Sequence, residues 1–210
     1  MSKIITRLYD EFYDGEHAVL ELQRIGVPDH DISLVSRKAN GKLDGVKLRE
    51  PKDHTAGGAA AIDGGAGVVG GGALGAAGGI LAGLGLLAIP GLGPVVAAGW
   101  LASAAVGAVV GGAIGGAAGG LVGALTHAGI SKDEADVYAE GVRRGGTLVS
   151  AKVEDAQRAS AEAALNSVAH VDIGARGSDY RDGGWTGFNA DLPPYAESEI
   201  AAERARHPAH

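Results

Sequence analysis

Apolar and polar residues at the start of the chain follow a pattern that predicts a strand, a helix and a second strand. Lys3–Tyr9 is rich in β-branched and apolar residues, which favours a strand. His17–Ile25 has apolar residues at helical spacing, and the Gly26 that follows is typical of a helix end. Ile32–Ser36 is predicted to be the second strand, and the polar, charged residues 37–56 are expected to form a loop.

A similar pattern follows residue 130. Ser131 and the glutamate three positions later have the spacing of a capping box, which predicts a helix over 132–144. Thr147–Val153 alternates as a strand. A helix is expected from Asp155 to about Val168, and Val171–Ala175 is predicted to be the last strand.

An uncharged block separates these two halves. Residues 64–126 contain no Asp, Glu, Lys, Arg or His, and 22 of these 63 residues are glycine. Pro90-Gly-Leu-Gly-Pro94 predicts a chain reversal. The flanking residues, 64–89 and 95–126, are expected to form two antiparallel helical arms of about 39 Å and about 48 Å. Either arm is long enough to cross the ~30 Å hydrocarbon core of a bilayer.

Glycine recurs at every fourth position of both predicted arms. Because four residues are close to one helical turn, each series would form a stripe along one face of its helix. A stripe without side chains allows the backbones of neighbouring helices to approach closely. Helix packing and oligomerisation are therefore predicted at Gly67, Gly71, Gly75, Gly79, Gly83, Gly99, Ser103, Gly107, Gly111, Gly115, Gly119 and Gly123. Lipid or such packing is required, because the eleven glycines of the first arm would cost about 10 kcal/mol relative to alanine in a helix in water.

Taken without the block, the predicted elements follow the order strand–helix–strand twice, with one extra helix before the third strand. This order is typical of the ferredoxin-like split βαβ fold. The predicted fold class is α+β: a small ferredoxin-like domain, discontinuous over 1–56 and 129–176, is interrupted by a Gly/Ala-rich antiparallel helical hairpin over 57–128. An extended C-terminal tail over 177–210 completes the chain.

Two interpretations of the tail follow from its composition, in which Gly, Pro, Asp and isolated aromatic residues dominate. It is either flexible or it docks on another surface. A short helix is expected at Glu197–Arg206. In the docking interpretation the anchors are Trp185, Phe188 and Tyr195.

The composition argues against several function classes. The chain carries 18 Lys and Arg against 25 Asp and Glu, a net charge of −7, which disfavours a nucleic-acid binder. There is no cysteine, so thiolate chemistry is excluded. The GxGxxG match at Gly65–Gly70 lacks a preceding strand and an acidic residue about twenty positions later. We therefore predict no catalytic residue, no metal, no cofactor and no identifiable small-molecule substrate.

Arg143 and Arg144 lie in the last turn of the predicted helix over 132–144, where the helix dipole favours cations. A solvated helix end is the expected role of this pair. An anion or a lipid headgroup is the alternative.

Two segments resemble a known family. ITRLYDEFYDGEHAVLELQRIGVPDHDISLVSR (5–37) and GISKDEADVYAEGVRRGGTLVSAKV (129–153) resemble the two halves of the bacterial general stress proteins with a heat-induced stress protein YflT-like domain. The Gly/Ala block resembles the glycine-zipper insertion of such proteins. The resemblance covers roughly residues 3–175 and implies a stress-associated bacterial protein without catalytic residues to transfer.

These features together predict a non-enzymatic stress-associated protein that self-assembles through a glycine-zipper helical hairpin. The hairpin is expected in or on the bacterial inner membrane, with the polar domain in the cytoplasm, so the predicted partners are other copies of the chain and the lipid bilayer. One alternative is a soluble homo-oligomer or polymer in the cytoplasm that uses the same glycine stripes. A regulatory module that binds a ligand or a partner is the other.

Overall fold

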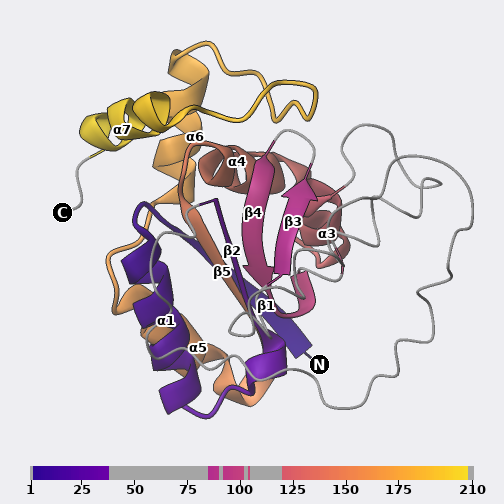
Figure 1. Ribbon diagram of the computed structural model, residues 1–210. Helices are drawn as coiled ribbons and strands as arrows, with labels where there is room; N and C mark the ends of the chain where they lie inside the picture. Colours follow the sequence, from indigo (N-terminus) through magenta and orange to yellow (C-terminus); the bar gives the residue numbers. More distant parts are fainter. Residues whose placement is uncertain (1, 38–84, 90–91, 102–103, 105–119, 208–210) are drawn as a thin grey trace, which may run out of the picture.

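The computed structural model describes residues 2–37, 85–89, 92–101, 104 and 120–207, which form an α+β fold (Figure 1). A five-stranded, wholly antiparallel sheet has the order β1-β5-β2-β4-β3. Its strands are β1 (Ser2–Tyr9), β2 (Ile32–Ser36), β3 (Gly85–Ile89), β4 (Gly93–Ala98) and β5 (Thr147–Glu154). The α-helices are α1 (Phe12–Arg24), α3 (Leu121–His127), α4 (Lys132–Arg143), α5 (Arg158–Asn166), α6 (Ile173–Asp182) and α7 (Glu197–Arg206). Single 3-10 turns lie at Asp29–Asp31 and Asp155–Gln157.

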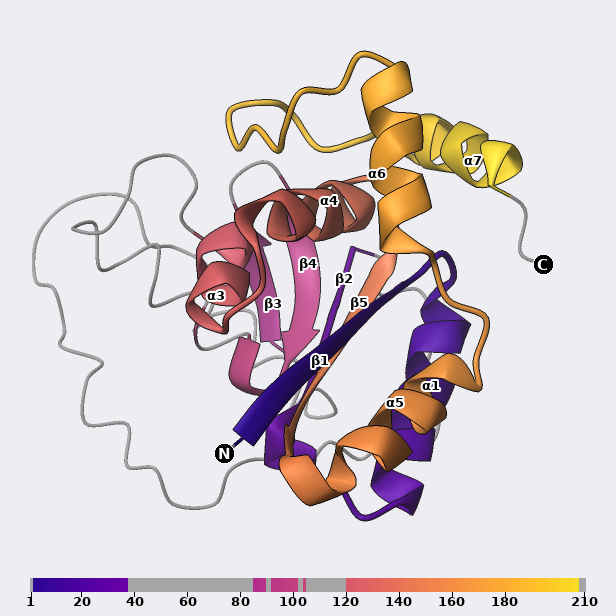
Figure 2. The same cartoon turned by 180° about the vertical axis from the view of Figure 1, so that it is seen from behind.

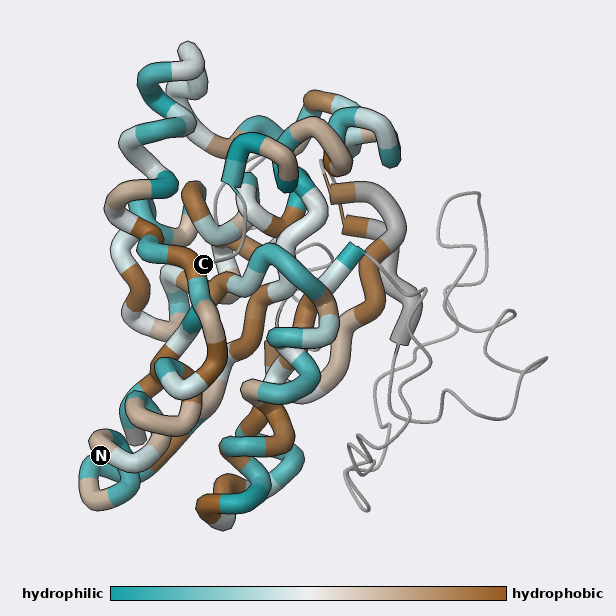
Figure 3. Tube along the Cα trace, turned by 90° about the vertical axis from the view of Figure 1, so that its left-hand side faces the viewer, coloured by the Kyte–Doolittle hydropathy of each residue, from teal (hydrophilic) through white to brown (hydrophobic). Residues whose placement is uncertain are grey.

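Helices cover both faces of the sheet (Figure 2). On one face α1 and α5 pack over a core of buried apolar side chains, among them Tyr9, Leu22, Ile32 and Leu165. On the other face α3 and α4 pack over a second core, which includes Leu8, Leu92, Leu125 and Leu148. In a view turned by 90°, the strands are largely hydrophobic and the helices alternate hydrophobic with hydrophilic residues (Figure 3). This pattern is expected of elements that bury one face.

Most elements predicted from local patterns lie close to the predicted positions, but α1 begins at Phe12, five residues before the predicted start at His17. β1 pairs with β5 along its whole length, from Ser2↔Glu154 to Tyr9↔Thr147. The N-terminus of α4 is capped as predicted, because the Ser131 hydroxyl accepts the backbone N–H of Glu134 at 3.3 Å. α7 has the predicted bounds.

The predicted helical hairpin is wrong at its centre, although the end of the predicted second arm, from Leu121, is helical in α3. Residues 85–89 and 93–98 are strands β3 and β4 of the sheet, not the ends of two helical arms. The reversal itself lies where predicted, with the Leu92 N–H bonded to the Ile89 carbonyl at 3.0 Å. The physical reason is the edge of β2: its backbone pairs with β4 from Leu34↔Ala98 to Ser36↔Val96, and this satisfies groups that a helix at 93–98 would have left unpaired.

The predicted last strand, Val171–Ala175, is also wrong. Val171 makes a single bridge to β1, its N–H donating to the Leu8 carbonyl at 2.8 Å. The Asp172 side chain then accepts the backbone N–H of Ala175 at 2.9 Å and so caps α6. The sheet therefore lacks the predicted fourth strand and instead extends at the other side through β4 and β3.

Candidate functional site

In the described part of the chain, a cluster of buried ion pairs lies where the C-terminal tail meets α4. At its centre is Glu140, whose side chain is fully buried. Its carboxylate accepts hydrogen bonds from Nε and Nη2 of Arg143, at 2.9 and 2.8 Å, and from Nε of Arg144 at 2.7 Å. A buried carboxylate needs such partners, because burial alone strongly disfavours its charge. The two arginines are thus internal ion-pair partners, and the predicted solvated helix end is wrong.

Arg144 links α4 to the tail. Its guanidinium carbon lies 4.0 Å from the centroid of the Tyr180 ring on α6, and Nη1 lies 3.1 Å from the Glu203 carboxylate on α7. Burial disfavours the charged form of Arg144. The hydrogen bond and charge of Glu140, with the charge of Glu203, outweigh this effect and raise its pKa. Arg144 therefore stays charged at the junction of three helices.

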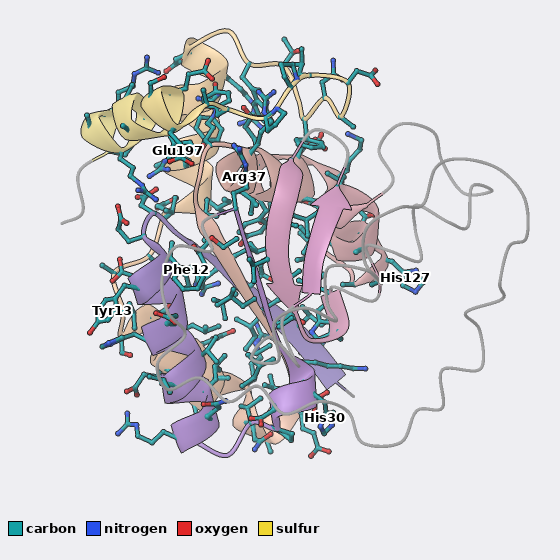
Figure 4. All side chains as sticks on the ribbon, in the orientation of Figure 1. Phe12, Tyr13, His30, Arg37, His127 and Glu197 are labelled. Atoms are coloured by element: carbon teal, nitrogen blue, oxygen red, sulfur yellow. The ribbon has the colours of Figure 1, made fainter. Side chains whose placement is uncertain are left out.

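Tyr195 lies beside both arginines. Its ring centroid is 5.1 Å from the Arg143 guanidinium carbon and 5.3 Å from that of Arg144, distances typical of cation–π contacts. Nη1 of Arg37, just after β2, donates to the carbonyls of Tyr195 and Arg143 at 2.8 Å each. Figure 4 shows Arg37 next to the start of α7, near Glu197. Burial lowers the pKa of Arg37, and the charge of Glu197 opposes that shift.

The other predicted anchors also contact the chain's own domain. The Trp185 ring packs edge-on against Tyr180, with ring centroids 5.8 Å apart. Phe188 is partly buried and packs on the core under α3 and α4. The tail from residue 183 to the end of α7 thus docks intramolecularly, and Trp185, Phe188 and Tyr195 are among its contact residues.

Two further ion pairs fasten the tail helices to the end of β1. Arg176 on α6 makes a bidentate pair with Asp10, at 2.8 and 2.9 Å, a geometry that gives both strength and orientation. Arg204 on α7 pairs with Glu11 at 3.1 Å. On the same helix, Ile200 is buried and lies against Gly145, where a Cβ would overlap its side chain.

A half-open hollow of about 350 Å³ lies between α6, α7 and Tyr195. Its lining contains both basic and acidic residues: Arg144, Arg206 and His207 on the one hand, Asp179 and Glu203 on the other. A second hollow, of about 240 Å³, runs along β1 between α4 and α5. Within the described ranges no three His, Asp or Glu side chains are grouped to hold a metal ion, and no described helix is long and apolar enough to span a bilayer.

Most of the predicted packing glycines lie outside the described residues: Gly67, Gly71, Gly75, Gly79, Gly83, Ser103, Gly107, Gly111, Gly115 and Gly119. Gly123 lies on α3 and is partly buried. Gly99 is not on a helix, which corrects its assignment to a helix stripe. It follows β4 with φ +80°, and a Cβ there would overlap the carbonyl oxygen of Ile32. The space that glycine leaves is filled by the backbone of a neighbouring strand.

Sequence reasoning missed Glu140 and the role of its arginines. One signal was present, since Glu140 precedes Arg143 and Arg144 by three and four residues, the spacing of ion pairs on one helix. That spacing alone predicts an exposed pair. The burial comes from α6, Tyr195 and α7, which lie between 33 and 66 residues further along the chain.

No protein family model, curated protein or solved structure matched the chain.

Proposed function

We propose that this chain is a non-enzymatic protein that self-assembles, with the uncharged Gly/Ala block as the contact surface between copies. One observation carries the proposal: the centre of the block, β3 and β4, is built into the sheet of the folded domain. The regularly spaced glycines from Gly67 to Gly83 precede β3, and those from Gly107 to Gly119 follow β4. The domain therefore carries two glycine-rich segments, each attached to it at both ends.

The buried charges support an assembly role over catalysis. Glu140, Arg143 and Arg144 are used to hold the tail, and Asp10 with Arg176 fastens α6. Such internal pairing is what a structural role requires, because a paired buried charge is not available to a substrate.

The partner in this proposal is a second copy of the chain rather than lipid. A bilayer-spanning hairpin would need its reversal near residues 90–94 at the far side of the membrane, whereas the flanking strands β3 and β4 are in the sheet. A stress-related role and a cytoplasmic domain at the inner membrane are proposed on the resemblance and on the composition alone. A ferredoxin-like fold is likewise a proposal, and it is based on the order of the elements predicted from the sequence.

Gly75→Leu combined with Gly115→Leu tests the proposal in the full chain. A leucine on each stripe blocks close backbone approach, so the large species in sedimentation velocity and cross-linking should disappear. The matched control is Ala77→Leu with Ala117→Leu, which adds leucine side chains off the glycine stripes and should leave assembly unchanged. An unchanged size distribution in the glycine variant overturns the proposal. Fractionation with carbonate and detergent measures whether lipid is needed.

A further inference from the structure

β1 is an edge strand of the sheet (Figure 2). Two hydrogen bonds show which of its backbone groups point away from β5. The carbonyl of Leu8 accepts the N–H of Val171 at 2.8 Å, and the carbonyl of Thr6 accepts the Tyr138 hydroxyl at 3.1 Å. Both acceptors point away from β5. Because backbone groups alternate in direction along an antiparallel strand, the N–H and C=O of Ile4 point outward as well.

The outward groups form an open stretch of five residues. Val171 covers the edge at Leu8, but α6 begins two residues later and the chain leaves the sheet. In the described part of the chain, no other backbone segment pairs with β1 on this side. Among the described residues, Ser2 to Thr6 therefore presents open backbone groups with Ile4 at its midpoint, except for the Thr6 carbonyl, which accepts the Tyr138 hydroxyl and Nη1 of Arg7.

A hollow of about 240 Å³ follows this open stretch. On the face of α4 it is lined by Ile130, Glu134 and Tyr138. On the opposite face it is lined by Arg158 and Glu162 of α5. An unpaired strand edge between two helix layers is a template for the addition of an extended strand.

We propose that the occupant is β1 of a second copy, paired antiparallel about a two-fold axis at Ile4. In this register Ile4 lies opposite its own counterpart, and Ser2 lies opposite Thr6 in both directions. A two-fold interface requires a self-complementary surface. The open stretch meets this requirement at Ile4, whose N–H and C=O both point outward, and at the Thr6 N–H, which faces the Ser2 carbonyl of the other copy; the Thr6 carbonyl keeps its bonds to Tyr138 and Arg7. The product is a continuous ten-stranded sheet that joins two five-stranded ones.

The charges beside the edge favour a second copy over an unrelated extended peptide. Arg158 and Glu162 are one turn apart on α5, with 56% and 37% of their side chains exposed. α5 packs over β1 at this edge, so the two-fold axis places the two α5 helices antiparallel and side by side. Each Arg158 then faces the Glu162 of the other copy. Because each copy carries both charges, the two-fold axis pairs Arg158 with Glu162 twice, and no partner of another kind is needed.

A charge-swap experiment on the full chain tests the interface. Arg158→Glu leaves two acidic side chains at positions 158 and 162, and Glu162→Arg leaves two basic ones there. Each variant alone should lose dimerisation, by at least tenfold in dimer dissociation constant. An equimolar mixture should recover a heterodimer. Both variants lack the ion pair within α5, so recovery in the mixture reports a contact between chains. A mixture that stays monomeric overturns the proposal.

Cross-linking tests the register independently, because the chain has no native cysteine. Ile4→Cys should cross-link to a covalent dimer with a short bis-maleimide. His30→Cys, whose side chain is also exposed but lies away from the edge, is the matched control and should not. Ile4→Pro removes an N–H that makes no bond to β5, and proline is tolerated at such edge positions. This variant should fold and remain monomeric; a folded Ile4→Pro dimer contradicts the proposal.

The edge interface does not depend on the Gly/Ala block. In the Gly75→Leu and Gly115→Leu background, the charge-swap pair should still form a heterodimer although larger assemblies are lost. Loss of the heterodimer with retained large assemblies overturns the edge interface alone. A retained heterodimer together with retained large assemblies overturns the proposed role of the Gly/Ala block alone.

Discussion

The guanidinium of Arg144 lies over the ring of Tyr180, with its central carbon 4.0 Å from the ring centroid. This contact joins α4 to α6, and the pairs with Glu140 and Glu203 extend it to the centre of the cluster and to α7. A single side chain therefore connects all three helices. Between 183 and 199 most tail residues are exposed, so this contact is one of the few points at which the tail meets the domain.

Arg144→Met should loosen the tail. The change removes one ion-pair partner of the buried Glu140 carboxylate, which keeps Arg143, and takes a cation from Glu203 and from the Tyr180 ring. These losses together are expected to lower the free energy of unfolding by about 2–3 kcal/mol. Limited proteolysis should cut faster within residues 183–196. The control is Arg24→Met on α1, whose arginine side chain is 75% exposed and pairs only with Glu21 among the described residues; it should leave both measurements unchanged. Equal proteolysis of Arg144→Met and the native chain would contradict this role.

Gly99→Ala should be more destabilising than a positive φ alone explains. Gly99 has φ +80°, and a Cβ there would overlap the Ile32 carbonyl oxygen and approach the Ser33 hydroxyl to 2.6 Å. The expected loss in free energy of unfolding is more than about 2 kcal/mol. Gly26→Ala is the matched control, because Gly26 has φ +86° but open space around it; it should cost about 1 kcal/mol. Urea titration of both variants measures the difference, and equal losses would show that the backbone contact is unimportant.

Stability should fall between about pH 10 and about pH 12. Burial raises the pKa of Tyr138 from its ordinary value of 10.0 to about 12, and Arg7 opposes the shift. In this range the unfolded chain loses the phenolic proton before the folded chain does, so the contribution is complete below pH 10 and is lost as the pH rises. Burial raises the pKa of Tyr9 and Tyr180 as well.

The Tyr138→Phe variant isolates this effect. Its free energy of unfolding, measured by urea titration at pH values from 8 to 11, should decline less steeply with pH than that of the native chain. The difference in slope approaches about 1.4 kcal/mol per pH unit where only the unfolded state is ionised. The variant also loses the hydrogen bond to the Thr6 carbonyl, which lowers stability at every pH but does not alter the slope. Parallel pH profiles for the two proteins would contradict the shifted pKa.

Local patterns predicted the elements whose structure is dictated by neighbouring residues. β1, β2 and β5 follow from runs of β-branched and apolar residues, and α4 follows from helical spacing after Ser131. β3 and β4 were missed because a block of Gly, Ala and Leu shows no clear alternation of apolar and polar residues, which is the pattern that separates a strand from a helix. The aromatic residues of the tail indicated docking as one of two interpretations, beside a flexible tail. The surface on α4 where it docks could not be predicted, because that surface is formed by folding.

The sequence by itself determined the positions of these local elements, the net charge and the absence of thiol chemistry, because each depends on residue type and on spacing within a few turns. Only the tertiary structure decided that 85–98 is a β-hairpin, since the open backbone of β2 is created by folding. It also decided that Arg143 is buried and Arg144 partly buried. Their partners Tyr180, Tyr195 and Glu203 are distant in the chain, and only their approach removes water from the Glu140 carboxylate.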